Sequence, residues 1–397
     1  MKSMSIKVVA FLLCFFILWF FPLNIFSQGL PFELESPSAL LMDYDTGTIL
    51  YEKNPHEKLP IASITKVMTT LLALEAIEDG RIGLDDEVTV SEYAASMGGS
   101  QVFLDRGEKL PVSAILKAII VSSGNDASVA IAEKISGTEE AFVSRMNERA
   151  KELGMNNTSF SDCTGLSDEG NYSTAYDISI MSRELLKHPI FFKWSTIWLD
   201  NLKEAKNNTE LTNTNRLVRF YDGCDGIKTG STSKAKYCLS ATAKRGNLRL
   251  ISIVLAAPTS KTRFNEASKL MDYGFANYEA IPILKKGALV KKQINIIGGK
   301  EKALSGLASD DLSMLQKKGE SDDYELVDLI EEPIKAPIKK GDIIGSVLVK
   351  RDGKEIDSVD ILADRDIEVA NIYDYFVQII MNWSSASVNK MDKTDDK

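Results

Sequence analysis

The chain has 397 residues, of which 44% are apolar, 26% charged and 8% aromatic. This size predicts two or three domains, and the apolar fraction excludes disorder as a description of the whole chain. The net charge of −9 argues against nucleic acid as a partner, because binding phosphates requires clustered Lys and Arg. The sequence contains two histidines, which excludes a His-rich metal site.

The N-terminus has the pattern of an export signal. Lys2 and Lys7 precede an apolar run at 8–21, and Ser27 supplies a small residue before the expected cut. This order predicts a cleaved signal peptide at 1–27 and an exported mature protein. The apolar run is long for a signal, so an uncleaved anchor remains the alternative.

Residues 36–276 have the pattern of an α+β domain, with helices between terminal strands. Apolar alternation predicts strands at 38–42, 48–51, 226–231, 237–244 and 248–258. Helical periodicity, caps and stops predict helices at 63–78, 111–121, 126–135, 138–153, 173–187 and 263–275. Strands at both ends of a helical middle indicate an antiparallel sheet with helices on its faces.

The remainder changes character at about residue 280. Short β-like runs, including 343–350 and 356–363 on either side of an Asp-Gly turn, predict a small all-β domain at 280–369. An amphipathic helix is expected at 370–390, followed by a disordered polar tail at 391–397. The helix has an apolar face but little positive charge, so both membrane contact and packing on a protein stay open.

The histidines and cysteines carry no evident chemistry. His56 lies in a turn-like run and His188 at the end of a helical pattern, so any nucleophile is expected to use a different base. Three cysteines lie outside the signal, and such a sparse set is no disulfide framework. We interpret Cys163, Cys224 and Cys238 as small buried residues, with one disulfide left open.

The first candidate motif is Ser63-Ile64-Thr65-Lys66 at the start of a predicted helix. Side chains three positions apart share a helix face, so the Ser63 hydroxyl and the Lys66 amine can meet. Lysine acts as a base only when neutral, which requires lowering its pKa by about 3 units from ~10.4. Burial and a second nearby cation would both act in that direction.

Two further motifs are each weak alone. Ser123-Gly124-Asn125 is a polar break between apolar segments, which suits an ordinary turn but also a proton relay beside an amide. Lys228-Thr229-Gly230 lies on a predicted edge strand. Lys228 could supply the second cation there, Thr229 a hydroxyl for a carboxylate, and Gly230 room for a substrate backbone.

The three motifs occur together in the order and contexts of a serine acyl-transferase set. The chain thereby resembles the penicillin-recognising enzymes, and among them the low-molecular-mass penicillin-binding proteins that are serine-type D-alanyl-D-alanine carboxypeptidases. Further blocks resemble those of the family, namely 59–66, 123–127, 173–177, 213–215, 225–230 and 336–341. The chain as a whole looks like the family's sporulation-associated Gram-positive branch. The resemblance extends from about 36 to 383.

The resemblance implies the role of each matching residue. Ser63 would be the acylated nucleophile, Lys66 its general base and Ser123 a further catalytic residue. The positions implied to bind substrate are Asn125, Lys228, Thr229, Gly230, Ser231 and Arg263. Backbone N–H groups of Ser63 and Ser231 would form the oxyanion hole. Thr229 and Arg263 would hold the terminal D-Ala carboxylate.

The resemblance implies removal of the terminal D-Ala from peptidoglycan stem pentapeptides, in the β-lactamase/transpeptidase-like fold. β-Lactam antibiotics would acylate the same serine, and no metal or organic cofactor would be required. Two departures are present. Ser231 stands where many relatives carry His or an aromatic residue, and 162–166 replaces the usual polar segment before Gly-Leu.

Two other functions remain as alternatives. A class A β-lactamase shares the three motifs, but its Glu-x-x-Leu-Asn block is absent from the sequence. A non-catalytic exported protein that binds the cell wall or acts as a scaffold would use the β domain or the terminal helix instead. Penicillin turnover compared with stem-peptide turnover distinguishes the first alternative.

Overall fold

The computed structural model of the chain describes residues 32–167, 170–320, 323–351 and 353–376. The predicted signal at 1–27 and the tail at 391–397 lie outside the described residues, as does most of the predicted helix at 370–390. Within the described residues, no helix combines the length and the apolar character needed to span a membrane.

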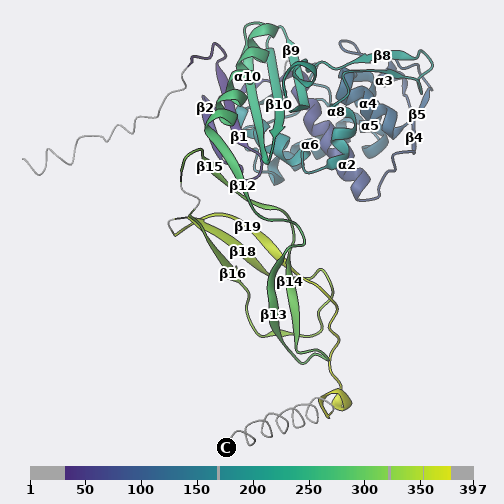
Figure 1. The fold of residues 1–397 in the computed structure, drawn as a ribbon. Helices are drawn as coiled ribbons and strands as arrows, with labels where there is room; N and C mark the ends of the chain where they lie inside the picture. The colour runs from purple at the N-terminus through teal and green to yellow at the C-terminus, as the bar shows by residue number, and fades with distance from the viewer. Residues whose placement is uncertain (1–31, 168–169, 321–322, 352, 377–397) are drawn as a thin grey trace, which may run out of the picture. The chain divides into compact units, whose positions relative to one another are not determined.

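The first part of the chain is built on a five-stranded antiparallel sheet in the order β2-β1-β11-β10-β9 (Figure 1). Every residue of β1 is buried, which is typical of a strand covered on both faces. The sheet confirms the antiparallel arrangement expected from the sequence. Its strands are β1 (Ser38–Asp43), β2 (Ile49–Lys53), β9 (Cys224–Thr232), β10 (Lys236–Arg245) and β11 (Leu248–Ala257).

Helices cover both faces of this sheet. Leu250 points to α10, because a side chain added at Gly274 would lie 2.5 Å from its Cδ1. Ile253 lies three residues after Leu250 on β11, so its side chain points to the other face of the sheet. Its cross-strand partner Ser240 shares that face, and the Ser240 hydroxyl lies 2.8 Å from the Ser182 hydroxyl of α7. The helix α10 (Ser260–Asn277) and the helix α7 (Ala175–Leu185) therefore lie on opposite faces.

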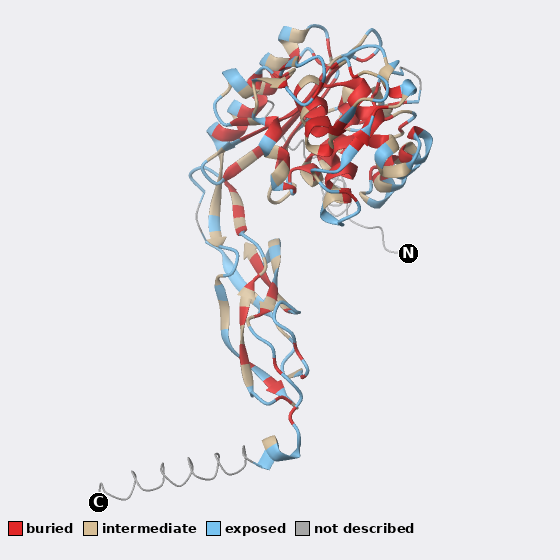
Figure 2. Ribbon diagram, turned by 90° about the vertical axis from the view of Figure 1, so that its right-hand side faces the viewer, coloured by how far each residue is buried: buried red, intermediate tan, exposed pale blue. Residues whose placement is uncertain are grey.

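The remaining helices form the apolar interior beside the sheet. Buried residues gather in them and in the central strands, as Figure 2 shows. The longer ones are α2 (Lys66–Glu78), α4 (Val112–Ser122), α5 (Asn125–Ser136) and α6 (Glu139–Glu152). Short ones are η1 (Ala62–Thr65), α3 (Glu92–Ala95), η2 (Pro189–Phe191), α8 (Phe192–Ser195) and α9 (Leu217–Phe220).

Three small strand pairs were not expected from the sequence. Each has two to four residues per strand, too short for a clear alternation to show. They are β3 (Leu59–Pro60) with β6 (Tyr172–Ser173), β4 (Glu87–Thr89) with β5 (Lys109–Pro111), and β7 (Leu199–Leu202) with β8 (Thr209–Thr212).

The predicted helix at 63–78 begins differently from expectation. Residues Ala62–Thr65 form the 3₁₀ turn η1, and the α-helix starts at Lys66. Ala62 has a φ of 49°, a left-handed conformation that an α-helix does not accommodate. Ser63 therefore lies in a tight turn against the helix rather than in its first turn.

The caps and the small residues largely follow expectation. Thr138 caps α6, where its side chain accepts a hydrogen bond from Ala141, and Gly154 follows the helix end. The three cysteines of the described residues are free and buried. His188 is buried, and its Nδ1 lies 2.7 Å from Glu78, so this residue is packed rather than solvent-exposed.

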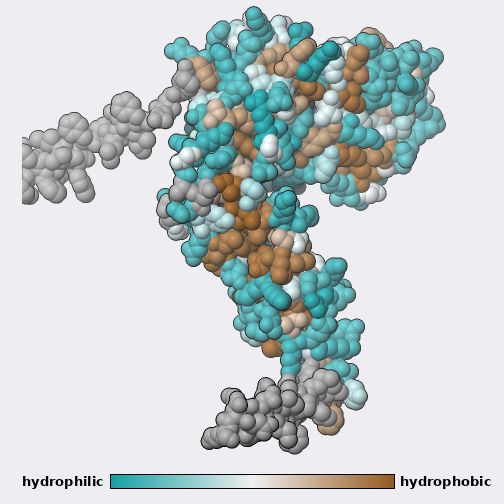
Figure 3. Space-filling model, in the orientation of Figure 1, coloured by the Kyte–Doolittle hydropathy of each residue, from teal (hydrophilic) through white to brown (hydrophobic). Residues whose placement is uncertain are grey.

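The second part of the chain is all-β, as expected, with its own apolar cluster. Its six-stranded sheet has the order β16-β18-β19-β14-β13-β17, and β12 pairs with β15. Apolar surface is visible on this part in Figure 3, and its exposed apolar side chains include Leu326, Leu329 and Ile343. The strands are β12 (Tyr278–Leu284), β13 (Leu289–Ile297), β14 (Ala303–Ala308), β15 (Leu312–Lys317), β16 (Glu325–Leu329), β17 (Ile334–Lys335), β18 (Ile343–Arg351) and β19 (Lys354–Ala363).

The chain continues into a helical turn at 372–376. Asn371 begins it, since its side-chain oxygen accepts hydrogen bonds from the backbone N–H groups of Tyr373 and Asp374. Ile372 is 90% exposed and Phe376 60% exposed, so this helical turn has exposed apolar side chains.

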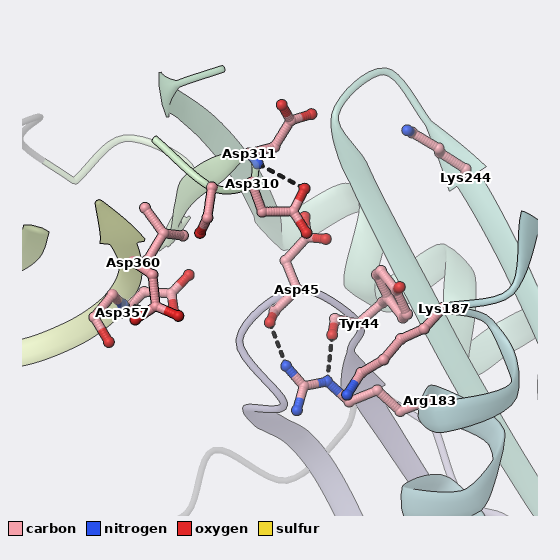
Figure 4. A pocket seen from close by; sticks show the side chains of 12 residues that line it. Tyr44, Asp45, Arg183, Lys187, Lys244, Asp310, Asp311, Asp357 and Asp360 are labelled. Atoms are coloured by element: carbon pink, nitrogen blue, oxygen red, sulfur yellow. Dashed lines mark hydrogen bonds between the residues drawn. The ribbon is translucent and has the colours of Figure 1, made fainter. Parts of the chain in front are cut away.

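Arginines tie the sheet to its surroundings. Arg183 of α7 donates to the backbone carbonyls of Tyr44, at 2.6 Å, and Asp45, which fixes the turn between β1 and β2 (Figure 4). Arg249 of β11 reaches across β10 to Asp225 of β9 with two hydrogen bonds of 2.7 Å. Such bidentate pairing fixes two elements in one geometry, and here it holds the edge strand β9 in place.

We expect Arg249→Ala to lower the free energy of unfolding by about 2–4 kcal/mol, because it leaves the partly buried Asp225 carboxylate without its partner. Denaturant unfolding of the purified chain measures this loss. Arg106→Ala is the matched control, since its pair with Glu92 is exposed and is worth less than about 1 kcal/mol. Equal losses in the two variants would contradict the role given to Arg249.

Candidate active site

The site is centred on the amine of Lys66, which is fully buried. Its Nζ lies 3.1 Å from Ser63 Oγ, 2.6 Å from Asn125 Oδ1 and 2.7 Å from the Thr164 carbonyl oxygen. Asn125 Oδ1 and the Thr164 carbonyl oxygen can only accept hydrogen bonds, so each takes one N–H of the amine. A neutral amine has two hydrogens and one lone pair. With both hydrogens donated, the lone pair points at the Ser63 hydroxyl.

Burial gives this lysine the protonation state that a base needs. It lowers the pKa of Lys66 to about 8, while Cys163 and the carboxylates Asp162 and Asp126 act in the opposite direction. The sequence suggested a second cation as a further cause, but desolvation is the dominant one. At neutral pH and above, an appreciable fraction of the Lys66 side chains is therefore uncharged.

The segment 123–125 joins the site between α4 and α5. Ser123 has a φ of 65°, a left-handed conformation that ends α4. Its buried Oγ has no hydrogen-bond partner within the described residues. Asn125 donates from its side chain to the Gly98 carbonyl at 2.6 Å and from its backbone to Ser100 at 2.7 Å. These contacts fix the amide so that its oxygen faces Lys66.

The strand β9 closes another side of the site. A Cβ at Gly230 would lie 2.5 Å from the Ile61 carbonyl oxygen, so only glycine permits the strand to approach η1 this closely. Lys228 is buried, and burial, with Lys66 and Arg263 nearby, holds its pKa well below its ordinary value. The motifs at Ser63 and Lys228, far apart in sequence, thus lie within electrostatic range of each other.

The residues after Lys228 have contacts of different kinds. Thr229 donates from its hydroxyl to the Thr214 hydroxyl at 2.8 Å. Ser231 is exposed on the same strand. Arg263 is buried, and its Nη1 donates to the backbone carbonyls of Gly230 and Cys238, so it braces β9 and β10 from behind. Binding of substrate by Arg263 stays a prediction.

Several site groups could not be identified from side-chain motifs. Thr164 contributes through its backbone carbonyl, which any residue would supply, and Gly98 acts in the same way on Asn125. Thr214 contacts Thr229 through its hydroxyl. The blocks at 162–166 and 213–215 were noticed in the sequence, but their contacts depend on the tertiary structure.

The comparison with protein families decides where this chain belongs. A family model described as D-alanyl-D-alanine carboxypeptidase, peptidase S11, matches residues 25–259. A second model, the C-terminal domain of penicillin-binding protein 5, matches residues 278–369. The first model covers more than half of the chain. The chain belongs to the D-alanyl-D-alanine carboxypeptidase family.

Individual members of the family are similar to this chain over most of its length. The D-alanyl-D-alanine carboxypeptidase DacF of Bacillus subtilis is 45% identical over 355 residues, which is 88% of this chain and 90% of that protein. Penicillin-binding protein 5 of Haemophilus influenzae, at 34% identity, superposes with a TM-score of 0.69 over 85% of this chain and 99% of that structure.

A third relative was solved with a bound antibiotic. Penicillin-binding protein D2 of Listeria monocytogenes in its ampicillin-bound form is 33% identical, with a TM-score of 0.54 over 61% of this chain and 98% of that structure. The lower share of this chain reflects the shorter length of that structure. These comparisons confirm the family, the fold and the class of serine hydrolase expected from the sequence.

Proposed function

We propose that this chain removes the terminal D-Ala from peptidoglycan stem pentapeptides through an acyl-enzyme on Ser63. The observation that carries the proposal is the position of the buried Lys66 amine, 3.1 Å from the Ser63 hydroxyl, with its other two directions occupied by acceptors. Family membership supports the same reaction.

Acylation begins with neutral Lys66. As Ser63 Oγ attacks the carbonyl between the two D-Ala residues, its proton passes to Lys66 Nζ, and the carbonyl oxygen becomes an oxyanion. Backbone N–H groups of Ser63 and Ser231 stabilise that charge. When the C–N bond breaks, the proton passes to the departing amine through the hydroxyl of Ser123, which bonds to no other group among the described residues.

Deacylation repeats the sequence with water. Lys66 takes a proton from the attacking water, the ester bond to Ser63 breaks, and the proton returns to Ser63 Oγ. The shortened peptide leaves as a carboxylate. No step requires a metal ion or an organic cofactor.

Binding of the substrate's free carboxylate falls to the strand β9. The substrate carboxylate favours the protonated form of Lys228, which pairs with it. Thr229 supplies a hydroxyl, Gly230 leaves space for the peptide backbone, and Asn125 lies beside Lys66 next to the scissile peptide. Arg263 contributes positive charge from behind the strand. Penicillins would enter the same site, because their ring amide takes the place of the scissile peptide.

We also infer that the chain works outside the cytoplasm, in keeping with a peptidoglycan substrate. Support comes from the signal-peptide pattern at 1–27. The separate apolar clusters support a catalytic domain at 36–276 and a C-terminal domain at 280–369.

Acylation should depend on pH through Lys66. Since its pKa is lowered to about 8, the neutral base is lost as the pH falls below that value. The second-order rate constant for acylation should fall about tenfold per pH unit on the acid side and level off above pH ~8. Stopped-flow measurements with a fluorescent penicillin test this, and a rate that is flat from about pH 6 to 9 would contradict it.

The central test uses a labelled penicillin and mass spectrometry of the intact chain. We expect one covalent adduct, located on Ser63 and absent from Ser63→Ala, together with release of D-Ala from a stem pentapeptide. An adduct that persists in Ser63→Ala would defeat the assignment. Rapid turnover of penicillin without release of D-Ala would instead favour the β-lactamase alternative. The absence of both activities would favour a non-catalytic binding protein.

We propose weak peripheral membrane contact through the segment 370–390, for which the sequence predicts an amphipathic helix, supported by the exposed Ile372 and Phe376. Co-sedimentation with phosphatidylglycerol vesicles should decrease when the chain ends at Ala370, and partly when both side chains become serine. If the truncated chain partitions as the full chain does, the helix has no such role.

A further inference from the structure

The loop 162–167 places a backbone carbonyl against the catalytic base, and a single carboxylate organises that loop. Lys66 Nζ donates to the Thr164 carbonyl at 2.7 Å, and Thr69 Oγ1 donates to the Cys163 carbonyl at 2.6 Å. Two consecutive carbonyls of the loop are thus bonded to one side of α2. The orientation of these two peptide groups decides whether Lys66 finds its acceptor.

The opposite ends of the same two peptide groups are held by Asp162. The N–H of Thr164 belongs to the peptide that carries the Cys163 carbonyl, and it donates to Asp162 Oδ1 at 2.7 Å. The N–H of Gly165 belongs to the peptide that carries the Thr164 carbonyl, and it donates to the same oxygen at 2.5 Å. In a trans peptide the N–H and C=O point in opposite directions, so a carboxylate at one end fixes the other.

The carboxylate is well suited to this task. Its Oδ1 also accepts from the Thr164 hydroxyl at 2.8 Å, and its Oδ2 accepts from Asn171 Nδ2 at 2.6 Å and from the Ser167 N–H at 3.1 Å. Burial alone would raise the pKa of Asp162, but these hydrogen bonds hold it below its ordinary value. A charged acceptor on the N–H of Gly165 also polarises the peptide and strengthens the Thr164 carbonyl as an acceptor.

The loop also contacts the residue that precedes the nucleophile. A Cβ at Gly165 would lie 1.9 Å from the Ala62 carbonyl oxygen, and Gly165 has a φ of 74°, so this position requires glycine. The loop therefore touches the residue before Ser63 and the amine of Lys66 together. A displaced loop would release both.

We propose that Asp162 is a positioning residue for the acyl-transfer reaction, aligning the Thr164 carbonyl with Lys66 through the 164–165 peptide. The inference rests on the proposed function, because it assigns Asp162 an effect on Lys66 as a general base. It concerns a residue that touches neither substrate nor nucleophile. Motif comparison did not identify Asp162, since 162–166 departs from the segment usual in the family.

The test measures acylation of the full chain by a fluorescent penicillin, per active site, as a function of pH. Asp162→Ala removes every acceptor and should lower the plateau rate by about 10–100-fold. Asp162→Asn keeps Oδ1 for the two N–H groups and should lose less than about tenfold. Asp86→Ala, which removes a comparable loop contact with the Gly83 N–H, is the matched control and should acylate normally.

The plateau rate reports the alignment of Lys66 and the acid limb reports the charge of Asp162, and together they separate both effects from general stability. The charged or titratable groups with an electrostatic effect on this region are Asp126, Cys163, Lys228, Glu139 and Tyr93, and they remain in every variant. Asp162 raises the pKa of Lys66, so its loss should move the acid limb to lower pH in both variants. A residue that only stabilised the fold would lower the melting temperature and leave the limb in place.

An exchange variant provides a rescue. Asp162→Asn points an N–H at the side-chain N–H of Asn171, and Asn171→Asp in the same chain turns that clash into a hydrogen bond and restores a nearby negative charge, although it removes the 3.2 Å bond from Asn171 Nδ2 to the Ser167 carbonyl. Plateau and limb should then return toward those of the native chain. Native rates and an unshifted limb in Asp162→Ala would overturn the proposal. If the native chain itself forms no adduct, the proposed function fails instead.

Discussion

The structure depends on removing one lysine side chain from water. An ammonium group without a carboxylate in direct contact is costly to bury, so the surrounding protein favours the neutral amine of Lys66. The acceptors Asn125 and Thr164 then make that amine directional, because they occupy both of its hydrogens. The η1 turn, the 123–125 segment, the 162–167 loop and β9 all surround this one atom. Together these segments exclude water from the Lys66 amine and orient it toward Ser63.

The order of helices and strands was predictable from the sequence. The contacts that bring the site segments together were only partly predictable. The strands β9, β10 and β11 alternate clearly and end in turns, so their antiparallel pairing followed from local pattern. The helix at 63–78 was expected to begin at Ser63, but Ala62 adopts a left-handed conformation, and its carbonyl lies against Gly165, more than 100 residues away. The short pairs such as β7 with β8 have too few residues to give a pattern.

Some site residues were predictable from the sequence and others were not. Ser63, Lys66, Asn125 and Lys228 carry distinctive side chains at recognisable spacings, and the structure brings them into one region. Thr164 and Gly98 act through backbone carbonyls, for which a sequence holds no side-chain signal. The cause of the lowered pKa of Lys66 was partly predictable, because burial was expected and dominates, whereas the nearby groups Cys163, Asp162 and Asp126 raise that pKa in place of the second cation that was expected to lower it.

One consequence concerns the protein before it reaches this state. Ser63 and Lys66 are neighbours in sequence, yet the amine acquires its base character only when segments from 98 to 230 have enclosed it. In an extended chain the same lysine is hydrated and carries an ordinary positive charge at neutral pH. The unfolded polypeptide therefore lacks the base that activates Ser63, and that base forms only when the fold is complete.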